Sequence, residues 1–600
     1  MKLRGGAILA KALKKYGVDT IFSLPGHQIL SVFDACIDEK ITLISTRHEL
    51  SAIYMAEGMS YATQEMGVVL LAGGPELTDA LTGLAKAYYA NTPLLVISGT
   101  NPVAKLDKGF PQDMDQMTIV KPFTKWCKAC YDGRRIPEYL HAAYRHALRG
   151  RPGPVYLEIP YDILEEEVKR KDIVFPEKPP RVRSCGDEES LEMTLRLTQE
   201  AKKPILIAGS GVFWSQAEDE LQEFVEKSGI PLFITTAASA MRFPSELVAG
   251  LGTPAGGRYS LRAITQADLV ILLGTRINFM LGFGQAPFFS SKQKIIQIDI
   301  EPSEIGQHRD VDVGVVGDIK EILAHLNPRL AERNDLATWQ DYLKKERESF
   351  QKELLNLSST NDTPLHPMRL VKAMEEQRKS DSTLILDGAN SALWAILGVE
   401  PRSEGQIIFS PIGDLEAIGA GVPHAIALKL GNPDKQVILH TGDGSFGFCI
   451  MEYETAVRYK IPFVAVVHND CAWGMTRDMQ IEFFGKDRQI GNELNLVRYD
   501  LVVQALGGHG EFVENPADLE PALKRALGSG LPACVNVVVD PKPKSPGLVM
   551  WTLMEIMLGK KTYYDKLPQI IKKLEAWHLS GFVRPLILKH MEGQMHKDMK

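Results

Sequence analysis

Short apolar runs alternate with longer amphipathic segments along most of the chain. The runs are rich in valine, isoleucine and leucine, and they occupy residues 41–44, 68–71, 94–97, 155–159, 204–211, 269–274, 295–300, 437–439 and 461–467. Apolar runs of this length indicate strands that are buried on both faces, and the segments between them indicate covering helices. The alternation therefore predicts an α/β fold of doubly wound parallel sheets.

Two polar segments divide this pattern into three predicted domains, at residues 1–170, 187–330 and 366–541. The first divider, residues 165–183, is charged and rich in proline, and the second, residues 331–365, is polar with a helical pattern. Several domains are expected, because a chain of 600 residues is too long for one hydrophobic core. Residues 542–600 continue with apolar residues at helical spacing, which predicts a helical extension that forms either a lid or an oligomer contact.

Composition narrows the classes of partner and compartment. The formal net charge is −7, so the chain lacks the basic character that a nucleic-acid-binding protein needs. We find no apolar run near the roughly 20 residues of a membrane span and no secretory pattern at the start, so we expect a cytoplasmic protein without a membrane partner. The seven cysteines are scattered, and disulfides are not expected.

The segment that follows the run at 437–439 carries the strongest chemical signal. Gly442 and Gly444 allow the backbone to approach an anion, and the helix that should open at Ser445 favours a phosphate at its N-terminus. Asp443 can hold a divalent cation against that phosphate, and Asp470 returns to the same sheet edge after one further helix and strand. With the carbonyl of Ala472 as a third ligand, the set suits magnesium.

A second signal lies far upstream, directly after the run at 41–44. Glu49 follows Thr46, Arg47 and His48 at the carboxyl end of a predicted strand, where open α/β sheets place their chemistry. On its own this acid could be a solvated residue at a strand end. Its combination with the downstream glycine and aspartate pattern favours a functional role.

These two signals, in this order, resemble the acetolactate synthase-like group of thiamin diphosphate (ThDP) enzymes. Further matches extend the resemblance over nearly the whole chain, at residues 24–26, 56–58, 151–155, 387–390 and 418–419. The resemblance implies a pyrimidine-binding domain, a central domain and a diphosphate-binding domain, with the first and third as divergent copies of one fold. It also implies a homodimer or homotetramer whose sites lie at the subunit interface.

The resemblance assigns roles to individual residues. Glu49 would bond N1' of the aminopyrimidine ring, the carbonyl of Glu416 would bond N4', and Ile418 would be the wedge that bends the cofactor. Magnesium would be held by Asp443, Asp470 and Ala472. The remaining cofactor contacts would be Gly388, Ala389, Asn390, Gly442, Gly444, Ser445, Trp473, Gly474 and Met475.

Other ligands are expected in the central domain. Gly209, Ser210 and Gly211 lack the full dinucleotide fingerprint, so bound ADP is left open and FAD is not expected. The segment 274–284 resembles that of oxalyl-CoA decarboxylases and 2-hydroxyacyl-CoA lyases, which makes Arg276 and Asn278 candidate contacts for CoA or a nucleotide.

Three residues are candidates for proton transfer. His27 and Gln28 follow Pro25 and Gly26, close to the expected thiazolium, although His27 could instead cap the next helix. Glu493 lies in a segment, 473–493, that resembles the lyases. In a partly apolar pocket its carboxyl could exchange a proton with a substrate hydroxyl, and otherwise it is a solvated loop acid.

The pattern is closest to bacterial 2-hydroxyacyl-CoA lyases. We therefore expect a lyase, dependent on ThDP and Mg²⁺, that cleaves a 2-hydroxyacyl-CoA into formyl-CoA and an aldehyde or ketone, and that runs in reverse as an acyloin-type carboligase. One alternative is an acetolactate synthase-like decarboxylase and carboligase of 2-oxo acids. An inactive scaffolding homologue is the alternative from another class.

Overall fold

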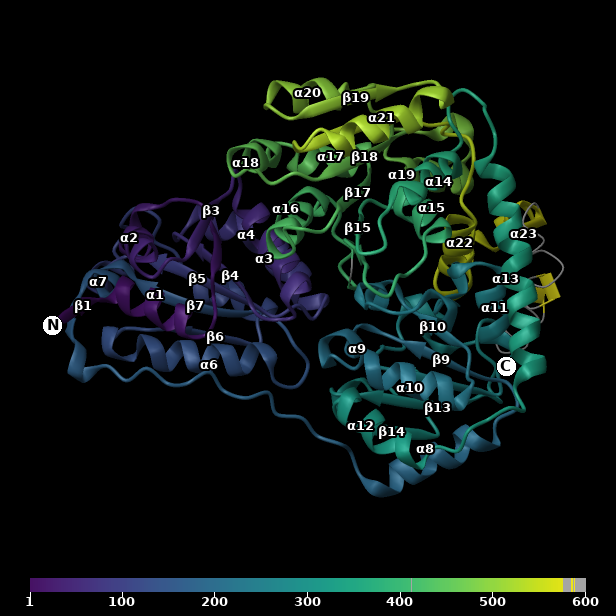
Figure 1. Ribbon diagram of the computed structural model, residues 1–600, viewed down its shortest axis with the longest axis horizontal. Coiled ribbons are helices and arrows are strands. Elements are labelled where there is room, and N and C mark those ends of the chain that lie inside the picture. The colour runs from purple at the N-terminus through teal and green to yellow at the C-terminus, as the bar shows by residue number, and fades with distance from the viewer. Residues whose placement is uncertain (412, 576–583, 586, 589–600) are drawn as a thin grey trace.

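Three six-stranded parallel sheets, each covered by helices, form the body of the protein (Figure 1). The computed structural model describes residues 1–411, 413–575, 584–585 and 587–588. Each of the nine apolar runs overlaps a strand, and the predicted α/β fold with three parallel-sheet domains is confirmed. The domain boundaries at 1–170, 187–330 and 366–541 stay a prediction.

The first sheet is formed by the N-terminal part of the chain. Its strands, in spatial order, are β3 (Thr42–Ser45), β2 (Thr20–Ser23), β4 (Gly67–Leu71), β5 (Leu94–Thr100), β7 (Val155–Pro160) and β6 (Trp126–Ala129). Every residue of β5 is buried, as expected for a central strand with helices on both faces. The helices nearest to the site are α3 (Glu49–Thr63), which starts at Glu49, and α4 (Pro75–Tyr89).

The third sheet repeats this topology strand for strand. Its spatial order is β16 (Gln406–Phe409), β15 (Thr383–Leu386), β17 (Val437–Gly442), β18 (Val464–Asn469), β20 (Ala533–Val538) and β19 (His509–Val513). In both sheets the second strand along the chain lies at one edge and the last two strands exchange places. The order agrees with the expectation that the first and third domains are divergent copies of one fold.

The central sheet has a different order. Its strands run β11 (Val248–Leu251), β10 (Leu232–Ile234), β9 (Pro204–Ala208), β12 (Leu269–Leu273), β13 (Lys294–Asp299) and β14 (Val313–Val316). The direction of winding reverses between β9 and β12, and open sheets of this order bind ligands in the crevice at that point.

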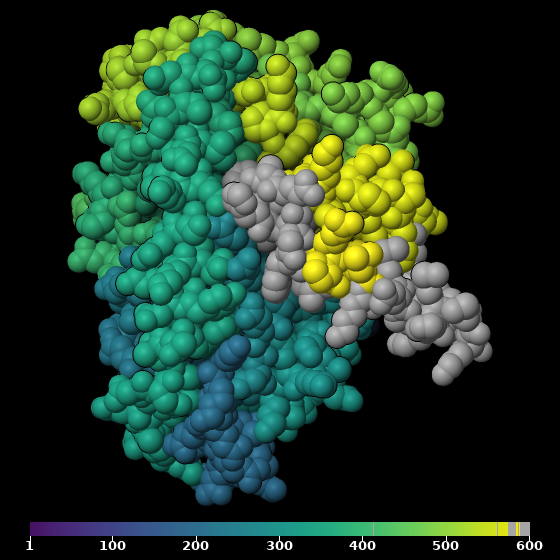
Figure 2. Space-filling model, turned by 90° about the vertical axis from the view of Figure 1, so that its right-hand side faces the viewer, coloured from purple at the N-terminus to yellow at the C-terminus, as the bar shows by residue number. Residues whose placement is uncertain are grey.

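Helices join the sheets into one body. α3 of the first domain packs along α16 (Gly421–Gly431) of the third, so closely that a Cβ on Gly58 would lie 3.0 Å from the Ala427 Cβ. The fully buried Glu57 carboxylate bonds His424 Nε2 (3.0 Å) and Lys86 Nζ (2.5 Å) at this contact. The long helix α13 (Ala337–Ser358) runs beside the central and third domains, near the yellow C-terminal segment (Figure 2).

The described part of the extension is helical, as predicted. It comprises α22 (Pro546–Leu558), a short helical turn at Lys561–Lys566 and α23 (Leu567–Glu575). Residues 576–583, 586 and 589–600 of the expected extension lie outside the described residues. None of the helices that the structure describes is both long and apolar enough to cross a membrane.

Candidate functional site

Three aspartates stand at the carboxyl ends of three neighbouring strands in the third sheet. Asp387 follows β15, Asp443 follows β17, and Asp470 follows β18. β17 lies between the other two strands, and its Gly442 is in register with His468 of β18. Parallel pairing therefore brings the three carboxylates to one edge, although they lie far apart in the sequence.

Asp443 is buried and oriented by backbone groups. Its Oδ1 accepts from Gly444 N (2.9 Å) and its Oδ2 from Ala472 N (3.2 Å), while the Tyr499 hydroxyl donates to its carbonyl (2.9 Å). Burial, and then the nearby Asp470, raise the pKa of Asp443 to about 7. A bound divalent cation would stabilise both charged carboxylates, so this donor set suits such an ion.

Asp470 forms the other side of this edge. Its Oδ2 accepts from Arg477 Nη2 at 3.0 Å, a contact that the sequence analysis did not foresee. Gly474 begins α19 (Gly474–Phe484), and a Cβ there would lie only 2.5 Å from Asp470 Oδ2. Glycine is therefore required where the chain passes the carboxylate.

Glycines let the surrounding backbone pack closely against neighbouring side chains. Gly388 adopts φ 90°, and a Cβ there would meet Ser391 Oγ at 2.5 Å and Ser445 Oγ at 3.0 Å. A Cβ on Gly444 would meet the Trp473 ring at 2.6 Å. Asn390 Oδ1 is buried without a partner among the described residues. The unpartnered Asn390 oxygen atom and the first backbone N–H groups of α17 (Asp443–Cys449) are polar groups that a diphosphate with its metal ion could engage.

Asp387 is a residue whose role the sequence did not reveal. Its carboxylate accepts from Gly419 N (3.2 Å) and Gly421 N (3.1 Å), and so it fixes the segment that carries Ile418. Glu416 lies just before this segment with φ 50°, an uncommon conformation for a residue with a side chain. The position of Asp387 within the 387–390 motif was the available signal.

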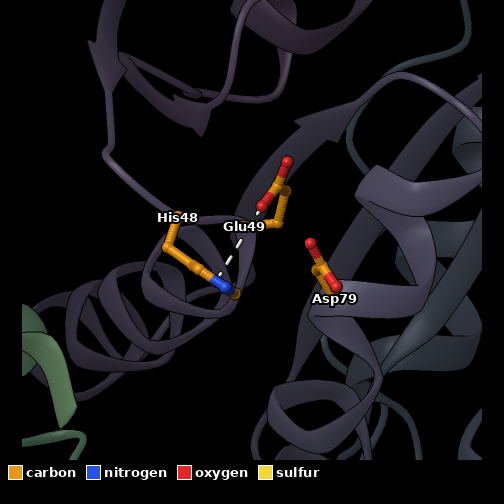
Figure 3. Close-up of side chains that lie close together, drawn as sticks. All are labelled: His48, Glu49 and Asp79. Atoms are coloured by element: carbon orange, nitrogen blue, oxygen red, sulfur yellow. Dashed lines mark ion pairs between the residues drawn. The ribbon is translucent and has the colours of Figure 1, made fainter.

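Glu49 lies at the carboxyl edge of the first sheet, between His48 and Asp79 (Figure 3). The ligand atoms of these three residues lie within 4.8 Å of one another. The Nδ1 atom of His48 already accepts from Leu50 N (3.1 Å) as the N-cap of α3, so its lone pair is engaged. His48 and Asp79 are exposed, and we interpret the group as the polar surroundings of Glu49 rather than a metal centre.

Glu49 and the two aspartates Asp443 and Asp470 belong to different sheets. Among the hydrogen bonds and ion pairs between described residues, none joins Glu49 to Asp443 or Asp470, and His48 Nδ1 lies 3.8 Å from Glu49 Oε2.

His27 and Gln28 differ in their surroundings. The His27 side chain is exposed, with its ring 6.2 Å from that of Tyr161. Gln28 is buried; its Oε1 accepts from Gly73 N (2.6 Å), and its Nε2 donates to Asn101 and Gln112 (3.3 Å each). Gln28 would have to break these bonds to contact a substrate, so catalytic roles for both residues stay predictions.

We call Asp443 and Asp470 the aspartate clamp. Glu493 is joined to this clamp through its backbone. It forms an isolated antiparallel bridge with Ala472, and the neighbouring Asn492 carbonyl accepts from Trp473 N at 2.8 Å. The Glu493 side chain itself is exposed in the single chain. Its proposed proton transfer stays a prediction.

A large cavity lies between the central and third domains, and residues of the first domain such as Tyr89 and Arg151 also line it. Its volume is about 680 Å³, and it extends from the switch point of the central sheet, at Gly211 and Asp299, to Gly388, Ile418 and Met475. Arg276 and Asn278 also line it, but both bond Asp414, with Arg276 Nη1 at 2.8 Å and Asn278 Nδ2 at 2.9 Å. Asp414 therefore occupies the donors that we expected to face a phosphate.

The chain matches three family descriptions in sequence. "Thiamine pyrophosphate enzyme, N-terminal TPP binding domain" matches residues 3–119, the central domain of the same family matches 191–326, and its C-terminal TPP binding domain matches 387–537. Thiamine pyrophosphate is another name for ThDP. The first and third matches contain Glu49 and the three aspartates, respectively.

Full-length relatives share this organisation. The chain is 32% identical to an acetolactate synthase large subunit of Mycobacterium tuberculosis, over 91% of this chain and 97% of the relative. It is 29% identical to a 2-hydroxyacyl-CoA lyase of Arabidopsis thaliana (90% and 96%) and 30% identical to an oxalyl-CoA decarboxylase of Escherichia coli (90% and 95%). The chain therefore belongs to the thiamin diphosphate-dependent enzymes, in the group that includes these three activities.

Proposed function

We propose that the protein is a 2-hydroxyacyl-CoA lyase, dependent on ThDP and Mg²⁺, that forms formyl-CoA and an aldehyde or ketone and catalyses the reverse carboligation. The observation that carries this proposal is the cavity of about 680 Å³ between the central and third domains. Pockets of roughly 300–1,000 Å³ hold drug-sized ligands. A CoA-linked substrate could place its nucleotide part in the central domain and its acyl part near Ile418.

Two of the relatives support a CoA-linked substrate, because a 2-hydroxyacyl-CoA lyase and an oxalyl-CoA decarboxylase are both named for acyl-CoA chemistry. Buried Asp299 at the end of β13 is suited to a ribose hydroxyl, and bound ADP is a further ligand that this end could take. Arg276 and Asn278 would contact a CoA phosphate only after releasing Asp414.

We assign the magnesium ion to Asp443, Asp470 and the carbonyl of Ala472. The diphosphate would lie against the residues that the sequence pattern identified, Gly388, Ala389, Asn390, Gly442, Gly444, Ser445, Trp473, Gly474 and Met475. The Asn390 Oδ1 atom, buried without a partner among the described residues, supports this assignment. Ile418, held by the bonds of Asp387 to Gly419 and Gly421, would be the wedge under the cofactor.

We further propose that the working enzyme is at least a dimer. Glu49 of one copy would then complete the site formed by Asp443 and Asp470 of the other, as the resemblance to the family implies. Isologous pairing would give two equivalent sites per dimer. A tetramer would be a pair of such dimers.

The chemistry divides between cofactor and protein. When bound, ThDP supplies a carbanion at its thiazolium C2, which can add to a carbonyl and store the electron pair of a broken C–C bond. Glu49 would hold a proton at N1' of the pyrimidine, and the Glu416 carbonyl would accept from N4'. His27 or Glu493 would accept the proton of the substrate hydroxyl.

The helix α22 supports the lid interpretation of the extension. Its Trp551 and Glu555 line the cavity, and the Trp551 ring packs edge-on against Phe279 at 4.9 Å. A cover of this kind would exclude water from the reacting groups. Cytoplasmic location stays a prediction.

The second candidate is an acetolactate synthase-like decarboxylase and carboligase of 2-oxo acids, which the 32% identity to the mycobacterial enzyme favours. The two reactions separate in one assay. Purified protein with ThDP and Mg²⁺ would be given 2-hydroxyisobutyryl-CoA or a linear 2-hydroxyacyl-CoA, with pyruvate in parallel. Formyl-CoA without turnover of pyruvate is the expected result, and carbon dioxide with acetolactate but no formyl-CoA would support the second candidate.

A scaffolding homologue without activity would fail in both arms of the assay. It would also show no ThDP-dependent stabilisation, because a ligand stabilises only a protein that binds it.

A further inference from the structure

The loop that presents Glu49 is held by a helix from the other end of the chain. This loop, residues 45–48, connects β3 to α3. The helix α18 (Glu452–Arg458) of the third domain lies against it, and the contact joins residues about 400 positions apart. Glu49 is therefore supported from outside its own domain.

Two residues at the end of α18 hold the strand side of the loop. The Tyr459 hydroxyl accepts from Ser45 N (3.0 Å) and donates to the Leu43 carbonyl (3.2 Å). Arg458 Nη2 donates to the Ser45 carbonyl at 2.8 Å. These three bonds hold the last residues of β3.

Glu452, the first residue of α18, holds the helix side of the loop. Its side chain is 1% exposed, and its Oε1 accepts from Arg47 N at 3.0 Å, two residues before Glu49. Its Oε2 accepts from Thr455 Oγ1 at 2.7 Å. Burial raises the pKa of this carboxyl, and the hydrogen bonds from Thr455 and from the Arg47 backbone offset part of that rise.

The same stretch of chain carries the aspartate clamp. α17 begins at Asp443 and ends at Cys449, and α18 begins three residues later at Glu452. Cys449 Sγ also lies 3.6 Å from Ser51 Oγ in the first turn of α3. One short helical unit therefore begins at the clamp and ends against the Glu49 loop.

We propose that Glu452 is a positioning residue for Glu49. Glu452 ties the loop before Glu49 to the aspartate clamp of the same chain. This inference rests on the proposed role of Glu49 toward ThDP. In the proposed dimer, the clamp of one site would then be mechanically joined to the glutamate of the other. Glu452 itself would touch neither substrate nor cofactor.

The effect should be on the chemistry of the bound cofactor rather than on its capture. Loss of the Arg47 contact frees the loop, and a misplacement of about 1 Å can cost on the order of 100-fold in rate. The diphosphate and the metal would still be held by Asp443 and Asp470. A purely structural role for Glu452 would instead alter folding and leave the bound cofactor unaffected.

The test compares Glu452→Ala, Glu452→Gln and Glu454→Ala in the full-length protein. Glu454 is the control on the same helix: its carboxylate pairs with Arg458 and approaches the Arg47 side chain (4.0 Å), but among the described residues it accepts no hydrogen bond from the loop backbone. Binding of ThDP with Mg²⁺ would be measured by titration calorimetry. Exchange of the C2 proton of bound ThDP with deuterium would be measured by rapid quench and NMR.

Glu452→Ala should bind ThDP nearly as well as the wild type and exchange the C2 proton more slowly, by on the order of 10- to 100-fold. Glu452→Gln should restore much of the rate, because its amide oxygen can still accept from Arg47 N. Glu454→Ala should match the wild type in both measurements. If Glu452→Ala does not fold, Glu452→Asp, whose shorter carboxylate retracts from Arg47, should show the slower exchange.

Wild-type exchange in Glu452→Ala, or in Glu452→Asp where that variant is needed, would overturn the proposal. Equal slowing in Glu452→Ala and Glu454→Ala would also overturn it, since the effect would not be specific to the Arg47 contact. A wild-type protein that binds no ThDP would instead overturn the proposed function on which the inference rests.

Discussion

The first and third sheets have the same strand order, yet their carboxyl edges carry different chemistry. In the third sheet, three buried aspartates and several glycines gather at the ends of β15, β17 and β18. In the first sheet, the corresponding loops are filled by amide side chains, with Glu49 at one end. Gln28 bonds Gly73 N, and Gln116 bonds Gly74 N and Glu158.

This difference shows how one fold can supply two unlike halves of a site. Apolar strands determine the layers, whereas the few residues after each strand determine what the edge can bind. In the third sheet these residues leave backbone groups open for an anion. In the first sheet they occupy the backbone N–H groups with side-chain oxygens, which keeps the loops rigid around Glu49.

The largest effect should come from replacing Glu49, at the carboxyl edge of the first sheet. Glu49→Ala should lower kcat by on the order of 10²–10⁴-fold, because it removes the group that would hold a proton on the pyrimidine. The melting temperature should change little. Asp79→Asn, in the same cluster but exposed, is the control and should keep most of the activity. Normal turnover in Glu49→Ala would remove the first sheet from the chemistry.

A substitution at the carboxyl edge of the third sheet should lower the affinity for the cofactor. A ligand at 100 times its Kd stabilises a protein by about 2.7 kcal/mol, so ThDP with Mg²⁺ should raise the melting temperature of the wild type. Asp443→Asn should lose this increase, because one metal ligand is gone. The exposed Asp434→Asn should keep it. An undiminished increase in Asp443→Asn would show that this edge does not hold the cofactor.

The amide network of the first edge should affect stability more than binding. Gln116→Leu would leave Gly74 N without its partner and remove one of two donors to the buried Glu158 carboxyl, which also accepts from the Tyr156 hydroxyl; an unpaired buried group costs about 1–3 kcal/mol. Chemical denaturation should therefore show a lower free energy of unfolding. Affinity for ThDP should persist, and a selective loss of affinity at unchanged stability would assign these amides to the cofactor site.

The smallest effect concerns Glu76, whose Oε2 accepts from Ala72 N at 2.6 Å. Burial raises the pKa of this carboxyl from 4.5 to about 7, and the nearby Glu49 adds to the rise. The unfolded chain releases this proton at lower pH than the folded chain, so stability falls as pH rises from about 4.5 to 7. Glu76→Gln should lack this component.

The stability of Glu76→Gln relative to the wild type should therefore increase across that pH range and stay constant above it. Thermal unfolding of both proteins from pH 4 to 8 would measure the difference. Parallel curves over the whole range would contradict the raised pKa.

The sequence predicted the sheets well, because their strands are continuous apolar runs. It did not identify several shorter strands of these sheets, among them β6, β10, β14 and β16. It also missed β1 (Lys2–Arg4) and β8 (Glu167–Lys169), a short antiparallel pair rich in charged residues. Asp443 and Asp470 could be recognised because each directly follows an apolar run beside glycines or asparagine. Glu452 could not be recognised, because its partner Arg47 lies 405 residues away and no local pattern joins them.

The central claim is that Glu49 and Asp443 act in one site but come from different copies of the chain. The direct test is to mix Glu49→Ala and Asp443→Asn proteins, each inactive alone, by co-expression, and to measure turnover of purified mixed dimers. Each mixed dimer should hold one site with both native residues, and so recover about half of the wild-type turnover. Mixed dimers as inactive as their parents would contradict the shared site.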